Sequence, residues 1–228
     1  MSTLTFIRHG QAGSRDTYDV LSPLGQQQAS RLGEYLAAQH FSPDVFITGA
    51  LNRQQQTAAL LHAACPTLPT PTVLPLWNEF DLTSVYNGIA PQLAADDPAF
   101  AESFTALELS STDPTSPVHR RWTPADVAVI RAWVEGRYQF PGESWAHFSA
   151  RIRQALAELP AANILISTSA TPIGLCVAFA LDAPHPLRLA GALYNSSVTT
   201  LRFHSGDLHL QSFNSTPHLP DPTWRTHR

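Results

Sequence analysis

Short apolar runs alternate with longer amphipathic stretches over the first third of the chain. Apolar runs rich in β-branched and aromatic residues predict buried strands, and apolar or large side chains at steps of four predict helices. The first helix also has a start signal, because Ser22 can cap it and Pro23 fits its first position. The expected elements, in chain order, are a strand at Leu4–Ile7, a helix at Pro23–Gln39, a strand at Asp44–Thr48, a helix at Asn52–Ala64 and a strand at Thr72–Leu74.

The last third of the chain returns to the same pattern. A helix with an apolar stripe is expected at Glu143–Leu159, then a strand at Asn163–Ser167 and a helix at Pro172–Leu181. Two apolar runs at Ser197–His204 and Leu208–Phe213 predict a closing hairpin. Strands that alternate with helices favour a mostly parallel sheet with helices on both faces. We therefore expect an α/β fold, a three-layer sandwich.

The segment at about 80–140 differs from both of its flanks. Prolines break it up, Pro91 among them, because a proline within a helix removes a hydrogen bond. Two helical stretches are expected there, around Pro98–Leu109 and Thr123–Tyr138. We predict a single domain over residues 1–228, with a helical lid inserted at about 80–140. The domain ends in a polar tail at Asn214–Arg228.

Composition narrows the classes of function. The net charge is −4 and the basic residues are scattered, so no nucleic-acid partner is expected. Cys65 and Cys176 lie far apart and suggest neither a disulfide framework nor a metal site, which favours a reducing cytosol. The most apolar segment, Ile173–Leu181, is shorter than the ~20 residues that cross a bilayer. We expect a cytoplasmic protein without a membrane partner, and the sequence leaves a homodimer open.

Three polar motifs follow the predicted strand ends, where open α/β sheets place their sites. At the first, His9 can attack phosphorus, Arg8 can hold phosphate oxygens and Gly10 allows a sharp turn. At the second, Arg53 lies in the first turn of a helix, where a cation is unfavourable unless an anion binds there too. At the third, Glu79 stands beside aromatic residues, which suits a general acid. Each motif taken alone is equally typical of an exposed loop.

Taken together, the motifs resemble the histidine phosphatase superfamily, the phosphoglycerate mutase-like proteins. The resemblance implies a phosphohistidine mechanism, with attack by His9 while Arg8 and Arg53 neutralise the phosphate oxygens. It implies that Glu79 protonates the leaving oxygen, that the substrate is a small phosphomonoester, and that neither a metal nor another cofactor is needed. The matching pieces are Phe6–Gln11, Thr48–Ala58, the segment around Glu79, Phe140–Ser144 and the strand at Ile164.

Position 169 departs from the family pattern. The family carries a second histidine just after the fourth strand, and Ser169 stands in its place. In this turn the chain is similar to a bacterial branch of the superfamily that carries Thr-Ser. A serine hydroxyl can still donate to a phosphate oxygen, and main-chain amides entering the next helix, such as that of Ala170, can add to it. Losing one preorganised donor commonly costs ~10²–10³ in rate, and losing a charged one can cost more.

The loop after the first motif supplies two further candidates for phosphate or substrate binding, Gln11 and Arg15. A solvated arginine is the alternative for Arg15. Glycolytic mutase activity is disfavoured, because no site for a second acidic group can be located. Structural roles are expected for Asn195 and His218, rather than places in a pocket.

Two functions therefore stay open. The first is a metal-independent phosphatase that acts on a small phosphomonoester through phospho-His9. The second is a phosphate- or sulfate-binding homologue with little or no catalysis, because Ser169 replaces the second histidine. A serine hydrolase built on Ser169 is disfavoured, because the G-x-S-x-G elbow is absent.

Overall fold

The computed structural model describes residues 2–14, 17–113, 115–119, 122–204 and 207–227. The chain forms two compact units, which we describe separately. The first unit comprises Met1–Glu79 and Ile152–Arg228 and holds the sheet, and the second comprises Phe80–Arg151. None of the described helices is both long and apolar enough to cross a membrane.

The first unit is built on a six-stranded sheet with the strand order β3-β2-β4-β1-β5-β6. The four strands from β3 to β1 pair in parallel, and β5 and β6 close the sheet as an antiparallel pair. The mostly parallel sheet and the final pairing of two strands are as the sequence predicts. The strands are β1 (Ser2–Arg8), β2 (Val45–Thr48), β3 (Thr72–Val73), β4 (Ile164–Thr168), β5 (Val198–His204) and β6 (Asp207–Ser215).

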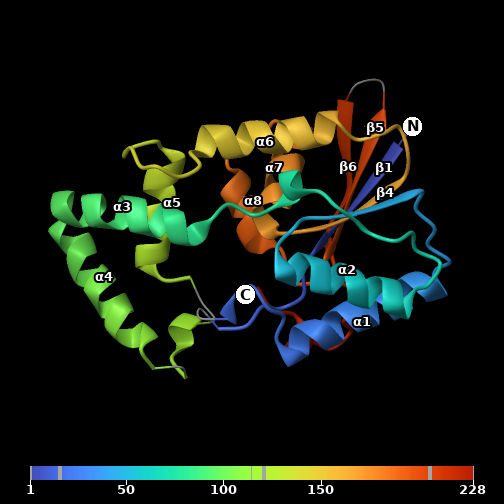
Figure 1. Ribbon diagram of the computed structural model, residues 1–228, viewed down its shortest axis with the longest axis horizontal. Helices are drawn as coiled ribbons and strands as arrows, with labels where there is room; N and C mark the ends of the chain where they lie inside the picture. The colour runs from blue at the N-terminus through green and yellow to red at the C-terminus, as the bar shows by residue number, and fades with distance from the viewer. Residues whose placement is uncertain (1, 15–16, 114, 120–121, 205–206, 228) are drawn as a thin grey trace. The chain divides into compact units, whose positions relative to one another are not determined.

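Helices cover both faces of this sheet, which confirms the three-layer sandwich (Figure 1). Two helices, α1 (Pro23–Ala38) and α2 (Asn52–Ala64), pack side by side on one face. The other face carries α7 (Ala170–Leu181) and α8 (Pro186–Ala192), and α6 (Trp145–Ala157) ends in this unit. The short 3₁₀ helices of the first unit are η2 (Pro75–Trp77) and η4 (Pro222–Trp224).

Strand alternation explains how one sheet serves two apolar layers. Ile7 of β1 and Leu165 of β4 belong to a buried cluster with the apolar stripes of α1 and α2. Phe6, one residue earlier, points to the other face and packs against Trp77, with ring centres 5.6 Å apart. Because both faces are buried, the strands read as continuous apolar runs rather than as alternating ones.

Local start signals account for the helices that the sequence places well. Ser22 caps α1 by accepting the N–H of Gly25 at 3.0 Å, with Pro23 in the first helical position. The prediction for α7 was wrong by two residues, because this helix begins at Ala170 rather than at Pro172. A proline is tolerated anywhere in the first turn, where the N–H groups have no partner within the helix. The short helix α8 was not predicted.

The second unit is helical, with α3 (Leu82–Asp96), α4 (Pro98–Ser111) and α5 (Pro124–Val134) packed against one another. It also holds a 3₁₀ turn, η3 (Pro117–His119), and the start of α6. The two predicted stretches match α4 and α5, but α3 was missed and Pro91 lies inside it rather than at a break. Asp81 caps α3, and the apolar side chains on one face of this helix are buried. Packing of these side chains therefore overrides the cost of the proline. The single domain with a lid at about 80–140 stays a prediction.

Candidate active site

The candidate site lies at the carboxyl ends of the parallel strands in the first unit. β1 and β4 end together, with Arg8 opposite Thr168, and β2 ends beside β4, with Thr48 opposite Ser167. His9 follows β1 directly, while α2 and α7 begin shortly after β2 and β4. In parallel sheets, this edge is where ligand sites form. The fold therefore brings the separate sequence motifs to one edge of the sheet.

The His9 ring is buried, and two contacts assign its proton. Nδ1 lies 2.7 Å from the main-chain oxygen of Gly10, which can only accept, so Nδ1 carries the hydrogen. Nε2 lies 3.2 Å from Nε of Arg53, which can only donate, so Nε2 carries the lone pair. His9 is thus a neutral imidazole whose Nε2 can act as a nucleophile.

Burial and charge both keep this ring neutral. Desolvation is the largest cause that lowers the pKa of His9 well below its usual 6.5, since the side chain is almost fully buried. The positive charges of Arg53 and Arg8 lower this pKa further, and the hydrogen bond to Gly10 acts in the opposite direction. Attack on phosphorus requires an unprotonated nitrogen, and the surroundings of His9 supply one at neutral pH.

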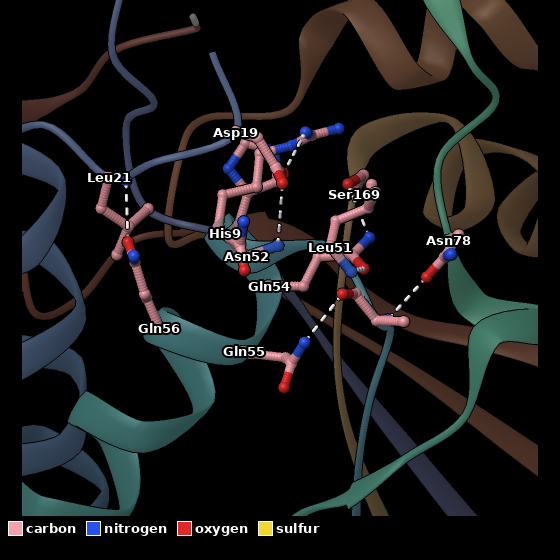
Figure 2. A network of polar contacts seen from close by, with 12 residues as sticks. His9, Asp19, Leu21, Leu51, Asn52, Gln54, Gln55, Gln56, Asn78 and Ser169 are labelled. Atoms are coloured by element: carbon pink, nitrogen blue, oxygen red, sulfur yellow. Dashed lines mark hydrogen bonds and ion pairs between the residues drawn. The ribbon is translucent and has the colours of Figure 1, made fainter. Parts of the chain in front are cut away.

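Arg53 has a second partner, the carboxylate of Asp19, on the loop that follows β1. Nη1 of Arg53 donates to Asp19 at 2.9 Å, and the guanidinium lies over the ring of Tyr18 at 4.9 Å from its centre. The other oxygen of Asp19 accepts the N–H of Asn52, the first residue of α2, at 3.2 Å. Figure 2 shows His9, Asp19 and Asn52 grouped at this helix start. A helix N-terminus and a cation both favour an anion, and here the anion is a carboxylate of the chain itself.

Arg8 is anchored by main-chain oxygens. Its guanidinium donates to the carbonyls of Leu193 and His227, so the chain's last described turn contributes to the site. Asn195 continues this support: it donates to the main-chain oxygen of His9 at 3.3 Å, and its side-chain oxygen accepts from Thr226 at 2.9 Å. The segment predicted as a polar tail therefore packs behind the His9 loop.

The loop after His9 is fixed by buried amide side chains. Gln11, a predicted phosphate ligand, accepts at its side-chain oxygen from Ser22 at 2.8 Å, and its main-chain N–H donates to Gln28 at 2.8 Å. Gly10 and Gly25 allow this loop to lie directly on α1, because a Cβ at either one would overlap the main chain opposite. The other predicted ligand on this loop, Arg15, lies outside the described residues.

Ser169 lies at the start of α7, next to the end of β4. Its side chain is buried, and its Oγ is 2.8 Å from Nε2 of Gln54 on α2. Figure 2 shows the side chains of Gln54 and Ser169 next to each other, with the hydrogen bond between them as a dashed line. Ser169 is therefore tied by a side chain from the helix that also carries Arg53.

Glu79 is placed at the same helix start. Its Oε2 accepts the main-chain N–H of Thr171, in the first turn of α7, at 3.1 Å. Among the described residues, no hydrogen-bond acceptor is found for the N–H of Ala170, the first residue of α7. This start of α7 thus presents a carboxylate, a hydroxyl and a main-chain donor, which suits both anion binding and proton transfer.

Two residues of the site, Asp19 and Gln54, were not predicted from the sequence, whereas Asn195 has the structural role that was expected of it. One signal for Asp19 was available. Leu51 precedes α2 and has no polar side chain for capping, so an acceptor from elsewhere was needed. Gln54 gave no such signal for its contact with Ser169, because the two residues lie far apart in the sequence. In the described part of the chain, no three His, Cys, Asp or Glu side chains gather as metal ligands.

Comparisons with solved structures place the fold. The chain is similar to a His-to-Ala variant of phosphoserine phosphatase from Entamoeba histolytica with phosphoserine bound, at 20% identity and a TM-score of 0.59, over 96% of this chain and 100% of that one. It is similar to a mycobacterial glucosyl-3-phosphoglycerate phosphatase, at 24% identity and a TM-score of 0.58, over 94% and 99% of the two chains. It is also similar to the α-ribazole phosphatase of Shigella flexneri, at 21% identity and a TM-score of 0.60, over 94% of this chain and 96% of that one. At these identities, the likeness concerns the fold.

The family is given by the sequence itself. A search of curated proteins found no match. The sequence model of the histidine phosphatase superfamily (branch 1), however, matches residues 4–125 and 114–216. These stretches include His9, Arg53 and Ser169 and cover most of the chain. The protein therefore belongs to the histidine phosphatase superfamily (branch 1).

Proposed function

We propose that the protein is a metal-independent phosphatase that hydrolyses a small phosphomonoester through a phosphohistidine on His9. The observation that carries this proposal is the state of the His9 ring. Its Nε2 is unprotonated, faces Arg53, and belongs to a ring whose pKa lies well below the usual value. A buried nucleophile beside two fixed guanidinium groups is suited to a dianionic phosphate ester.

The first step transfers the phosphoryl group to the enzyme. Nε2 of His9 forms a bond to phosphorus in line with the leaving oxygen, and the bond between phosphorus and that oxygen breaks. Arg8 and Arg53 balance the charge on the equatorial oxygens, so the protein supplies the charge that a metal provides elsewhere. Ser169 and the N–H of Ala170 donate from the β4 side.

Glu79 is the proposed proton donor. It gives a proton to the leaving oxygen, which departs as an alcohol, and later takes a proton from the water that attacks phospho-His9. The products are inorganic phosphate and free His9. Glu79 accepts a hydrogen bond from the main-chain N–H of Thr171 at the start of α7. This contact supports the role because it fixes the carboxyl group near the proposed phosphate site.

The related structures support a phosphomonoester as the substrate class. Their names are phosphoserine phosphatase, glucosyl-3-phosphoglycerate phosphatase and α-ribazole phosphatase. Arg15 and Gln11 stay our candidates for contacts to the substrate. Cytoplasmic location and a homodimer also remain proposals.

A phosphatase screen tests the proposal. Purified protein is assayed against a panel of phosphomonoesters, together with His9→Ala and a matched control, His147→Ala, which removes an exposed histidine of α6. We expect turnover and an acid-labile phosphoenzyme in the wild type and the control, and neither in His9→Ala. Folded wild-type protein that hydrolyses no ester and forms no phosphoenzyme would sink the proposal.

A second candidate function is anion binding with little or no turnover. The observation that favours it is Ser169, a neutral group where the family carries a histidine. In that case, phosphate would raise the melting temperature of the wild type but not of Arg53→Met, while turnover stayed at background. Turnover that depends on His9 rules this candidate out.

A further inference from the structure

Gln54 is the one glutamine of α2 that contacts Ser169 in the described structure, and its side chain is fully buried. Its neighbours on the same helix bind other groups: Gln55 donates to the main-chain oxygen of Ala50, and Gln56 accepts the N–H of Leu21. Burying an amide group without hydrogen-bond partners is costly. The amide of Gln54 makes three hydrogen bonds, which offset this cost.

The three contacts fix which end of the amide faces Ser169. The side-chain oxygen of Gln54 accepts the N–H of Leu51 at 3.3 Å, so this end is the carbonyl. Nε2 donates to the main-chain oxygen of Trp77 at 3.3 Å and, with its other hydrogen, to Ser169 at 2.8 Å. A flipped amide would place two acceptors together at Trp77. The Oγ of Ser169 is therefore an acceptor toward Gln54.

Ser169 is also released from capping its own helix. It occupies the N-cap of α7 but makes no capping hydrogen bond. The N–H of Thr171 is taken by Glu79, and Pro172 has no N–H to offer. Among the described residues, no acceptor is found for the Ser169 hydroxyl hydrogen. That hydrogen is available for an oxygen of a ligand.

The space around this contact is closed. Both side chains are buried, and a Cβ at Gly49 would overlap the side-chain oxygen of Gln54, so the amide needs a glycine there. The amide nitrogen of Gln54 lies only 2.8 Å from Oγ of Ser169, so we expect a larger imidazole at position 169 to overlap the Gln54 amide. Overpacking of this kind is destabilising.

We propose that Gln54 is a positioning residue that holds the Ser169 hydroxyl with its hydrogen toward the phosphate, and that the two residues together stand in for the family's second histidine. This inference rests on the proposed function only in that phosphate binds beside His9. In this arrangement the hydrogen-bond donor on the β4 side is an uncharged hydroxyl. Ser169 then acts together with Gln54 and is not a loss of function.

The test is a double-mutant cycle with Gln54→Met, Ser169→Ala and the double variant. Methionine keeps the length of the side chain and removes the amide. The readouts are the Kd for inorganic phosphate, measured by calorimetry, and kcat and KM for the best ester. Gln55→Met is the matched control, because it removes a neighbouring glutamine of the same helix that does not contact Ser169.

Each single variant should weaken phosphate binding by about tenfold, the usual scale for one hydrogen bond to a charged group. The double variant should be no weaker than Ser169→Ala, because Gln54 acts through Ser169. Gln55→Met should bind as the wild type does. Unchanged binding in Gln54→Met, or losses that multiply in the double variant, would overturn the inference.

A second comparison keeps the inference testable if Gln54→Met does not fold. Ser169→His alone should be destabilised, whereas Ser169→His combined with Gln54→Ala should recover stability and bind phosphate at least as tightly as the wild type. If Ser169→His alone is as stable and binds as well as the combination, the two residues do not share one volume. Phosphate binding without turnover would refute the phosphatase while leaving the pair open to this test, and a wild type that binds no phosphate refutes both.

Discussion

The two sides of the candidate site use different chemistry. On the β1 and β2 side, His9 and Arg53 contact each other directly, and Arg8 adds a second positive charge. On the β4 side, Ser169 and the start of α7 offer a hydroxyl and main-chain N–H groups, with Glu79 as the titratable group. The positive charge and the nucleophile are therefore concentrated on one side, while the hydrogen-bond donors on the other side are neutral.

Removing charge from the first side should have the largest effect. Arg53→Met deletes the donor to His9 Nε2 and one of the two guanidinium groups proposed to bind phosphate. We expect kcat/KM to fall by roughly 10³, at the upper end for one preorganised donor. Arg202→Met, on an exposed part of β5, is the control and should leave kcat/KM unchanged. A loss smaller than that of Ser169→Ala would show that the β4 side contributes more to kcat/KM than Arg53 does.

The packing behind His9 should come next. Thr226→Val removes the hydroxyl that donates to Asn195 and accepts from Gln28. Two lost hydrogen bonds should lower the free energy of unfolding by about 2 kcal/mol, measured by urea denaturation. Among the described residues, the hydroxyl of Thr223 bonds only to exposed Asp221, so Thr223→Val should change the free energy of unfolding much less. Equal effects would show that the tail is not part of the site.

The pH dependence of kcat/KM tests the surroundings of His9 on the first side. An ordinary histidine with a pKa near 6.5 would lose about tenfold in kcat/KM by pH 5.5, because only the unprotonated ring attacks. Desolvation, Arg53 and Arg8 lower the pKa of His9, so we expect kcat/KM to hold between pH 7 and pH 5.5. A tenfold acid loss, absent from substrate ionisation controls, would contradict the neutral, shielded ring.

The same shift has a consequence for stability. Below pH 6.5 the unfolded chain binds a proton at this histidine while the folded chain does not, so stability falls as the pH drops. Urea denaturation at pH 7 and pH 5 should show a smaller decrease in His9→Asn than in the wild type. An identical decrease would mean that His9 titrates normally in the fold.

The smallest expected effect concerns the internal anion on the first side. Asp19→Asn removes the carboxylate that contacts Arg53 and the start of α2, where we expect it to compete with phosphate. The Asp19 side chain is 44% exposed, so the pair is weak, and phosphate affinity should rise only about two- to fivefold. Asp44→Asn, at the opposite end of β2, is the control for calorimetry. Weaker phosphate binding in Asp19→Asn would show that Asp19 supports the site rather than competes for it.

Local signals explain why much of the fold could be predicted. The bounds of α2 match the prediction, and α1 begins at Pro23 after its Ser22 cap, because caps, prolines and apolar steps act within a few residues. The same reasoning failed at Pro91, where a helix persists through a proline. There, burial of the apolar face of α3 outweighs the local penalty of the proline.

The candidate residues of the site divide in the same way. His9 and Arg53 could be nominated from their places at strand and helix ends, since parallel strands bring those ends to one edge. Asp19 and Gln54 could not, because each acts on a partner from another element. The C-terminal segment was predicted only as a polar tail, yet the main-chain oxygen of His227 in this tail accepts from Arg8.

Three features could be predicted from the sequence alone: the alternation of strands and helices, the mostly parallel sheet and the strand ends that hold the candidate site. They follow from interactions between near neighbours in the chain. Three others could be assigned only in the folded protein: the lone pair on His9 Nε2, the carboxylate at Arg53 and the direction of the Gln54–Ser169 hydrogen bond. Each depends on groups that are distant in sequence, and their geometry exists only once burial has brought them together.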